Sequence, residues 1–146
     1  MSRVAGLDPG RSKCGLVLVD SASACVQTGL VLPRNNVVHQ LERWRQEASL
    51  QLILIGNGTG SGGWLERLKP IAEVQSVDEQ GTTLRARRRY WQLWPAQGWR
   101  RLIPEGLRLP PTDLDAIAAL VMVEDRLNLS CRWPGKPPRF KSEPEP

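Results

Sequence analysis

Acidic side chains stand at the ends of several apolar segments in this 146-residue chain. Asp8 ends the first apolar segment, and Asp78 and Glu79 end a later one. Asp115 lies in the first turn of the last predicted helix. Carboxylates that come close together repel one another unless cations lie between them, and Mg²⁺ or Mn²⁺ prefers carboxylate oxygen. Two such ions about 4 Å apart can activate a water molecule and stabilise the leaving oxygen of a phosphodiester. The pattern therefore favours a divalent-metal site.

Asp115 has an unusual position for a surface acid. Its helical face continues through Ala118, Ala119 and Met122, which are small and apolar and suit close packing. A carboxylate at the head of a buried stripe is costly unless it is paired or binds a metal. An acid in the first helical turn also interacts favourably with the helix dipole, which is sufficient to explain Asp113. For Asp115 the residue pattern leaves both explanations open.

The elements that would position these acids begin with three apolar segments. We expect strands over residues 2–7, 14–19 and 25–32, joined by short turns as an antiparallel meander. A helix capped by Asn35 or Asn36 should follow and run to residue 49. The continuous apolar run "LQLILIG" is typical of a strand that is covered on both faces.

The second half of the chain predicts alternating helices and strands. We expect a short helix over 64–68, a strand over 71–79, a helix that starts at Thr82 or Thr83, and a last helix from Asp113 to Leu127 capped by Thr112. The predicted fold is a single α/β domain, residues 1–128, with a mixed five-stranded sheet flanked by helices. Three of its strands are antiparallel and two more are parallel. Residues 129–146 are rich in Pro and charge, which predicts a flexible tail.

Composition narrows the functional classes. Twenty Lys and Arg against fifteen Asp and Glu give a net charge of +5, which is compatible with a polyanionic partner. The three cysteines lack C-x-x-C spacing and His39 stands alone, so a zinc site or a disulfide framework is not expected. No apolar run reaches the length of a membrane span, and the N-terminus lacks a signal-peptide pattern. We expect a reduced cytoplasmic protein with no membrane association.

Four ordered blocks resemble a known family. They are "GLDPGRSKCGLVLVD", "ILIGNGTGS", "VDEQGTT" and "DLDAIAALVM", and together they span residues 3 to about 128. They resemble the YqgF/RuvX branch of the RNase H-like superfamily, which is related to the RuvC Holliday-junction resolvases. The second block is most similar to the YqgF-like domain of the Tex protein.

The resemblance implies catalytic and metal-binding residues. Asp8 matches the family's first acid, Glu79 the second and Asp115 the last, with Asp78 and Asp113 as additional candidate ligands. The implied cofactor is two Mg²⁺ or Mn²⁺ ions. The implied activity is that of an endonuclease, a hydrolase that cuts structured nucleic acid in ribosomal RNA precursor processing or at Holliday-junction-like DNA.

Basic and small polar residues near these acids are candidates for nucleic-acid contact. Arginines on the helix after Glu79 would face outward and hold phosphates, and the loop after "LQLILIG" would approach the phosphate backbone. The predicted nucleic-acid-binding residues are Arg11, Lys13, Asn57, Thr59, Arg85, Arg88 and Arg89.

Departures from the family pattern keep other functions open. Gln80 and Gly81 replace the Arg-x of the family's "DERxTT" block, and Thr112 stands where RuvC-type resolvases carry a further acid. The main alternative is a catalytically inactive nucleic-acid-binding or ribosome-assembly module. The third alternative is a nucleotide-phosphate enzyme related to actin-like ATPases. Those enzymes bind the nucleotide between two domains, and this chain predicts a single small one. The sequence leaves RNA or DNA as substrate, and monomer or homodimer as assembly, undecided.

Overall fold

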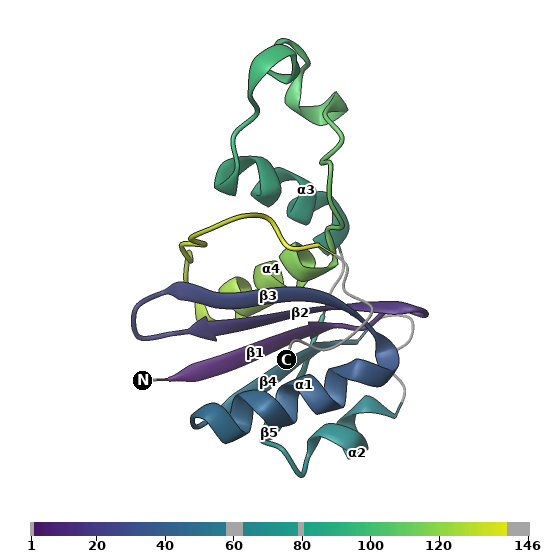
Figure 1. Ribbon diagram of the computed structural model, residues 1–146, viewed down its shortest axis with the longest axis vertical. Coiled ribbons are helices and arrows are strands. Elements are labelled where there is room, and N and C mark those ends of the chain that lie inside the picture. The colour runs from purple at the N-terminus through teal and green to yellow at the C-terminus, as the bar shows by residue number, and fades with distance from the viewer. Residues whose placement is uncertain (1, 58–62, 79–80, 140–146) are drawn as a thin grey trace.

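The computed structural model describes residues 2–57, 63–78 and 81–139 (Figure 1). Within these ranges the chain forms one five-stranded sheet with helices on both faces. The strands are β1 (Arg3–Asp8), β2 (Lys13–Asp20), β3 (Cys25–Pro33), β4 (Leu52–Gly56) and β5 (Glu73–Val77). The α-helices are α1 (Arg34–Glu47), α2 (Trp64–Leu68), α3 (Thr82–Leu93) and α4 (Asp115–Leu127). Two short 3₁₀ helices, η1 (Gly98–Leu102) and η2 (Glu105–Leu107), lie between α3 and α4.

The strand order across the sheet is β3-β2-β1-β4-β5. Strand β2 pairs antiparallel with both β1 and β3, whereas β4 pairs parallel with both β1 and β5. The predicted α/β architecture, with three antiparallel strands followed by two parallel ones, is confirmed. The carboxyl ends of β1, β4 and β5 consequently meet at one edge of the sheet, which is where open α/β sheets place their functional sites.

Side chains that alternate along the strands fill two apolar layers. Helices α1 and α2 cover one face, α4 covers the other, and α3 packs on the outer side of α4 (Figure 1). Strand β4 shows why a continuous apolar run was needed: Ile53 and Ile55 pack toward α1 and α2, while Leu54 packs toward α4. The prediction that this strand is covered on both faces is confirmed.

Close contact between α4 and the sheet depends on two glycines. A Cβ atom built on Gly6 would lie 2.9 Å from the carbonyl oxygen of Ala119, and one built on Gly15 would lie 1.9 Å from the carbonyl oxygen of Asp115. Neither distance is compatible with a side chain, so the two missing Cβ atoms let α4 lie directly against β1 and β2. This approach carries Asp115 to the sheet.

Two predicted helix caps were wrong, and one predicted helix start is confirmed. The residue before α1 is Pro33 and the residue before α4 is Leu114, and neither makes a side-chain cap. Helix α4 also begins at Asp115 rather than at Asp113. Helix α3 begins at Thr82, as predicted. Packing against the sheet, rather than a local capping bond, accounts for the starts of α1 and α4, as is common for helices inside a protein.

Residues 129–139 pack on the domain, a set of contacts that the prediction of a flexible tail did not anticipate. The backbone N–H of Val26 donates to the carbonyl oxygen of Arg132 at 2.8 Å, in an isolated parallel bridge at the start of β3. Trp133 lies against Gly29, where a Cβ would come within 2.2 Å of the indole ring. Apolar side chains inside the segment therefore attach it to the sheet. No helix among the described residues is long and apolar enough to cross a membrane.

Candidate active site

Asp8 and Asp115 approach each other across β2. Asp8 is the last residue of β1 and pairs with Gly15 in the antiparallel register. Gly15 in turn lies against the backbone of Asp115, the first residue of α4. Directly opposed residues in antiparallel strands have Cα atoms about 5 Å apart. Gly15 therefore bridges the two acids, which start on distant parts of the chain.

The charges of both acids also act on the thiol of Cys14. Burial raises the pKa of Cys14, the nearby Arg34 lowers it, and the charges of Asp8 and Asp115 raise it further. Both acids therefore lie near the start of β2.

The ends of β4 and β5 lie along the same edge. The register aligns Leu7 of β1 with Ile55 of β4, and Ile55 with Ser76 of β5. Asn57 follows β4 and donates its backbone N–H to the carbonyl oxygen of Val77 at 3.0 Å, and both Asn57 and the adjacent Asp78 are exposed. Two of the predicted site residues, Glu79 and Thr59, lie outside the described residues, so their roles stay predictions.

Lys13 is the cation of this site. It is the first residue of β2, and its ammonium group donates a hydrogen bond to Asp113. The same Nζ lies 3.9 Å from a carboxylate oxygen of Asp115. Asp113 pairs with Lys13 and precedes α4, so it does not lie in the first turn of the helix as expected. The predicted nucleic-acid contact Lys13 therefore already has two carboxylate partners within the protein.

The carboxyl group of Asp115 is only partly neutralised. Burial raises its pKa, Lys13 lowers it, and the charge of Asp113 raises it again, with burial the largest cause and a net shift upward. An acid held in this way gains from any additional cation, and carboxylate oxygens suit a hard divalent ion. Asp8, Asp113 and Asp115 therefore fit Mg²⁺ or Mn²⁺ in their chemistry. No group of three or more His, Cys, Asp or Glu side chains that could hold a metal ion occurs in residues 2–57, 63–78 and 81–139.

The loop between β1 and β2 carries a second cation toward solvent. Arg11 is exposed on this loop. Arg34, the first residue of α1, donates to the carbonyl oxygen of Gly10 at 2.8 Å and holds the loop from the opposite face of the sheet. No local pattern indicates this role for Arg34, because the contact joins residues that are far apart in the chain.

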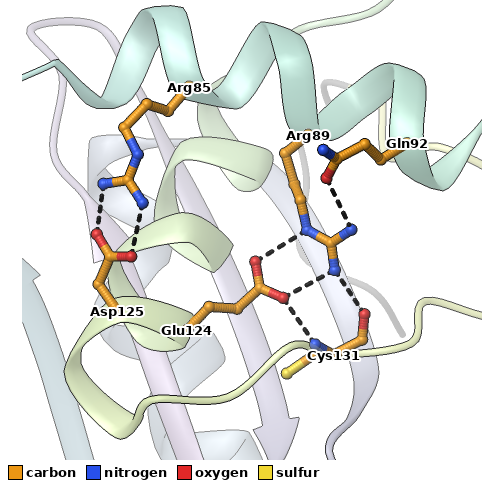
Figure 2. A network of polar contacts seen from close by, with 6 residues as sticks. All are labelled: Arg85, Arg89, Gln92, Glu124, Asp125 and Cys131. Atoms are coloured by element: carbon orange, nitrogen blue, oxygen red, sulfur yellow. Dashed lines mark hydrogen bonds and ion pairs between the residues drawn. The ribbon is translucent and has the colours of Figure 1, made fainter.

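The arginines of α3 divide into two groups (Figure 2). Arg85 makes a bidentate pair with Asp125 at 2.5 and 2.6 Å, and Arg89 pairs with Glu124 at 2.8 and 3.0 Å. Both partners belong to α4, so these two side chains attach α3 to α4 instead of facing outward as expected. Arg88 is exposed and remains the predicted phosphate contact on this helix.

Comparisons with known proteins give a match only at the level of structure. No protein-family model matches the sequence, and no curated protein matches it. Among solved structures, Thermus thermophilus RuvC aligns with a TM-score of 0.51 and 14% identity, over 88% of this chain and 98% of that chain. T. thermophilus RuvC in complex with a Holliday junction substrate aligns with a TM-score of 0.50 and 15% identity, over 84% of this chain and 90% of that chain.

At these identities the likeness concerns the fold. The chain has the RNase H-like fold of RuvC: a mixed five-stranded sheet flanked by helices, in one α/β domain. The alignment covers 84–88% of this chain and 90–98% of the RuvC chains, so the likeness extends over the whole domain.

Proposed function

We propose that this chain is a divalent-metal-dependent endonuclease of the YqgF/RuvX branch. It would hydrolyse phosphodiester bonds in structured nucleic acid, either ribosomal RNA precursors or Holliday-junction-like DNA. The observation that carries the proposal is the meeting of Asp8 and Asp115 across Gly15, at the edge where β1, β4 and β5 end. The RuvC fold and the complex of RuvC with a Holliday junction substrate support the same class of activity.

The acids would act as metal ligands. Asp8 and Asp115 would supply carboxylate oxygens from two elements, and Glu79 would supply a third from the segment after β5. A bound divalent ion would provide positive charge against the phosphate and a water molecule that loses its proton readily. Two ions are expected from the number of acids at this edge.

Other residues would hold the polyanion and orient the acids. Arg11, in the loop after Asp8, and Arg88, on α3, are exposed cations and would contact phosphates. Lys13 pairs with Asp113 and stays close to Asp115, so an incoming ion would have to displace its ammonium group from these carboxylates. Gly15 keeps Asp115 next to Asp8.

The direct test is cleavage by the purified chain. Four-way junction DNA and precursor ribosomal RNA are incubated with Mg²⁺ or Mn²⁺, and Asp8→Asn is compared with Glu73→Gln, an exposed acid at the opposite end of the sheet. We expect Asp8→Asn to lose cleavage about a thousandfold, since it removes a ligand used in the transition state. Cleavage that is equal in the two variants would remove the assignment.

A second candidate function rests on Lys13. Its ammonium group already gives Asp113 and Asp115 part of the positive charge that a metal ion would give. A chain in which this pairing replaces the metal would bind structured nucleic acid without cutting it. Isothermal titration with Mn²⁺ separates the two functions: heat of binding that disappears in Asp8→Asn supports the nuclease, and no binding to the unaltered protein supports the binding module.

A further inference from the structure

A groove of about 590 Å³ opens directly beside the acidic site. One wall is the segment that leads into α4 and includes Pro111 and Asp113, and the other is the C-terminal segment with Lys136 and Arg139. Tyr90 of α3 forms part of its lining and is almost fully buried. The groove therefore joins Asp113, which is paired with Lys13, to a part of the chain that the proposed chemistry does not use.

The C-terminal wall is held in place by its own contacts. The indole N–H of Trp94 donates to the carbonyl oxygen of Gly135 at 3.0 Å, and the Trp94 ring packs edge-on against Trp133 with their centroids 5.2 Å apart. Trp133 is itself seated on Gly29 of β3. Lys136 follows directly after these anchors, so the groove is a fixed feature of the fold.

The charge of the groove favours an anion. Lys136 and Arg139 are exposed, and neither makes a hydrogen bond or an ion pair with another residue in the described ranges. The one acid in the lining, Asp113, is bonded to Lys13. Two free cations thus lie in the same groove as a paired acid, and the proline side chains of its walls offer apolar surface to a base or sugar.

A second cavity of about 320 Å³ extends the groove away from the acids. The two cavities share Tyr90, Pro111 and Pro137, and the second also includes Arg100 of η1. Cations therefore occur along a continuous path from the acidic edge toward the arm between α3 and α4, which extends beyond the rest of the domain (Figure 1). An elongated anion suits this path better than a single small one.

We propose that this groove binds single-stranded nucleic acid, with Lys136 and Arg139 on its phosphates and the proline walls against its bases and sugars. The proposal deepens the proposed function, on which it rests, because a single strand that leaves the groove reaches Asp113 and then the paired acids. The groove would hold the unpaired strand next to the bond that is cut.

The test measures binding apart from cleavage. Full-length Asp8→Asn protein in EDTA is titrated into a fluorescein-labelled thymidine oligonucleotide of about 12 nucleotides, a length that spans such grooves, and fluorescence anisotropy gives the Kd. Lys136→Glu is compared with Lys69→Glu, which reverses the same charge on the exposed end of α2. We expect Lys136→Glu to weaken binding about tenfold, the size of one charge-assisted contact.

Salt dependence gives an independent measure. The slope of log K against log salt should decrease by about 0.7 when one contact to a single-strand phosphate is lost. That decrease is expected for Lys136→Glu and for Arg139→Glu, and not for Lys69→Glu. A blunt duplex of the same length should show no difference between Lys136→Glu and Lys69→Glu.

The outcomes separate this proposal from the nuclease itself. If Lys136→Glu and Lys69→Glu weaken oligonucleotide binding equally, or if the oligonucleotide does not bind, the proposed role of the groove is wrong. The cleavage test is unaffected by either result. Binding that depends on Lys136 in a protein that cuts neither junction DNA nor precursor RNA supports the groove and removes the nuclease. A preference of the groove for duplex over single strand also overturns the proposal.

Discussion

Two groups of charged residues lie on opposite ends of α4 and differ in how completely they are paired. At the carboxyl end, Glu124 accepts from Arg89 and from the backbone N–H of Cys131, and Arg89 also donates to the Cys131 carbonyl oxygen (Figure 2). At the amino end, Lys13 is the charged partner of both Asp113 and Asp115, and Asp8 lies across Gly15 from Asp115.

The charged residues at the two ends of α4 also differ in burial. The side chains of Arg89 and Glu124 are 16% and 10% exposed, whereas those of Lys13 and Asp115 are 40% and 31% exposed. A closed, satisfied network joins elements together, because every donor and acceptor is used. Asp113 and Asp115 share one ammonium group and stay partly open to solvent. Residues that look alike in sequence thus differ in burial and in pairing at the two ends of α4.

The largest effect on stability is expected at the network of Arg89, Glu124 and Cys131. Glu124→Ala leaves Arg89 charged and nearly buried and removes the acceptor for the Cys131 N–H, so we expect the free energy of unfolding to fall by about 3 kcal/mol. Urea unfolding followed by circular dichroism measures it. The matched control is Asp125→Ala, one residue further along α4, whose half-exposed pair with Arg85 should contribute about 0.5 kcal/mol. Equal losses in the two variants would contradict the comparison.

The next effect concerns the position of the acids. Gly15→Ala places a Cβ 1.9 Å from the carbonyl oxygen of Asp115, so the start of α4 must move away from β2. We expect a loss of about 3 kcal/mol or slightly less, the upper range for overpacking, together with weaker Mn²⁺ binding in isothermal titration. Gly106→Ala is the control, since nothing lies within 4 Å of its added Cβ. Unchanged Mn²⁺ binding in stable Gly15→Ala protein would show that Asp115 is not a ligand.

The smallest effect on stability is expected for Lys13, at the amino end of α4. Its removal should at the same time strengthen metal binding. Lys13→Met removes a pair that is 30–40% exposed, so the free energy of unfolding should change by about 1 kcal/mol or less. Because the ammonium competes with a metal ion for Asp113 and Asp115, the affinity for Mn²⁺ should rise about tenfold. Lys69→Met should leave both quantities unchanged. A lower affinity in Lys13→Met would mean that the lysine organises the site and does not compete for it.

Local sequence patterns were sufficient to predict most of the helices and strands. Alternating and continuous apolar runs gave the five strands, and the three-and-four spacing of Ala118, Ala119 and Met122 gave the buried face of α4. Capping residues failed as signals at α1 and α4, because tertiary packing fixed these helix starts at residues without a side-chain cap, whereas α3 begins at Thr82 as predicted. The segment 129–139 looked flexible from its prolines and charges, yet Cys131 and Trp133 were enough to attach it to β3.

The sequence alone determined the five strands, their mixed antiparallel and parallel character and the acid at the end of β1, since these follow from short-range periodicity and from the lengths of connections. Only the tertiary structure decided which charges meet. Lys13 and Asp113 are 100 residues apart, and Arg85 and Asp125 are 40 apart. No local pattern specifies such partners, because they depend on how closely α4 approaches the sheet at Gly6 and Gly15 and on which face of α3 turns toward α4.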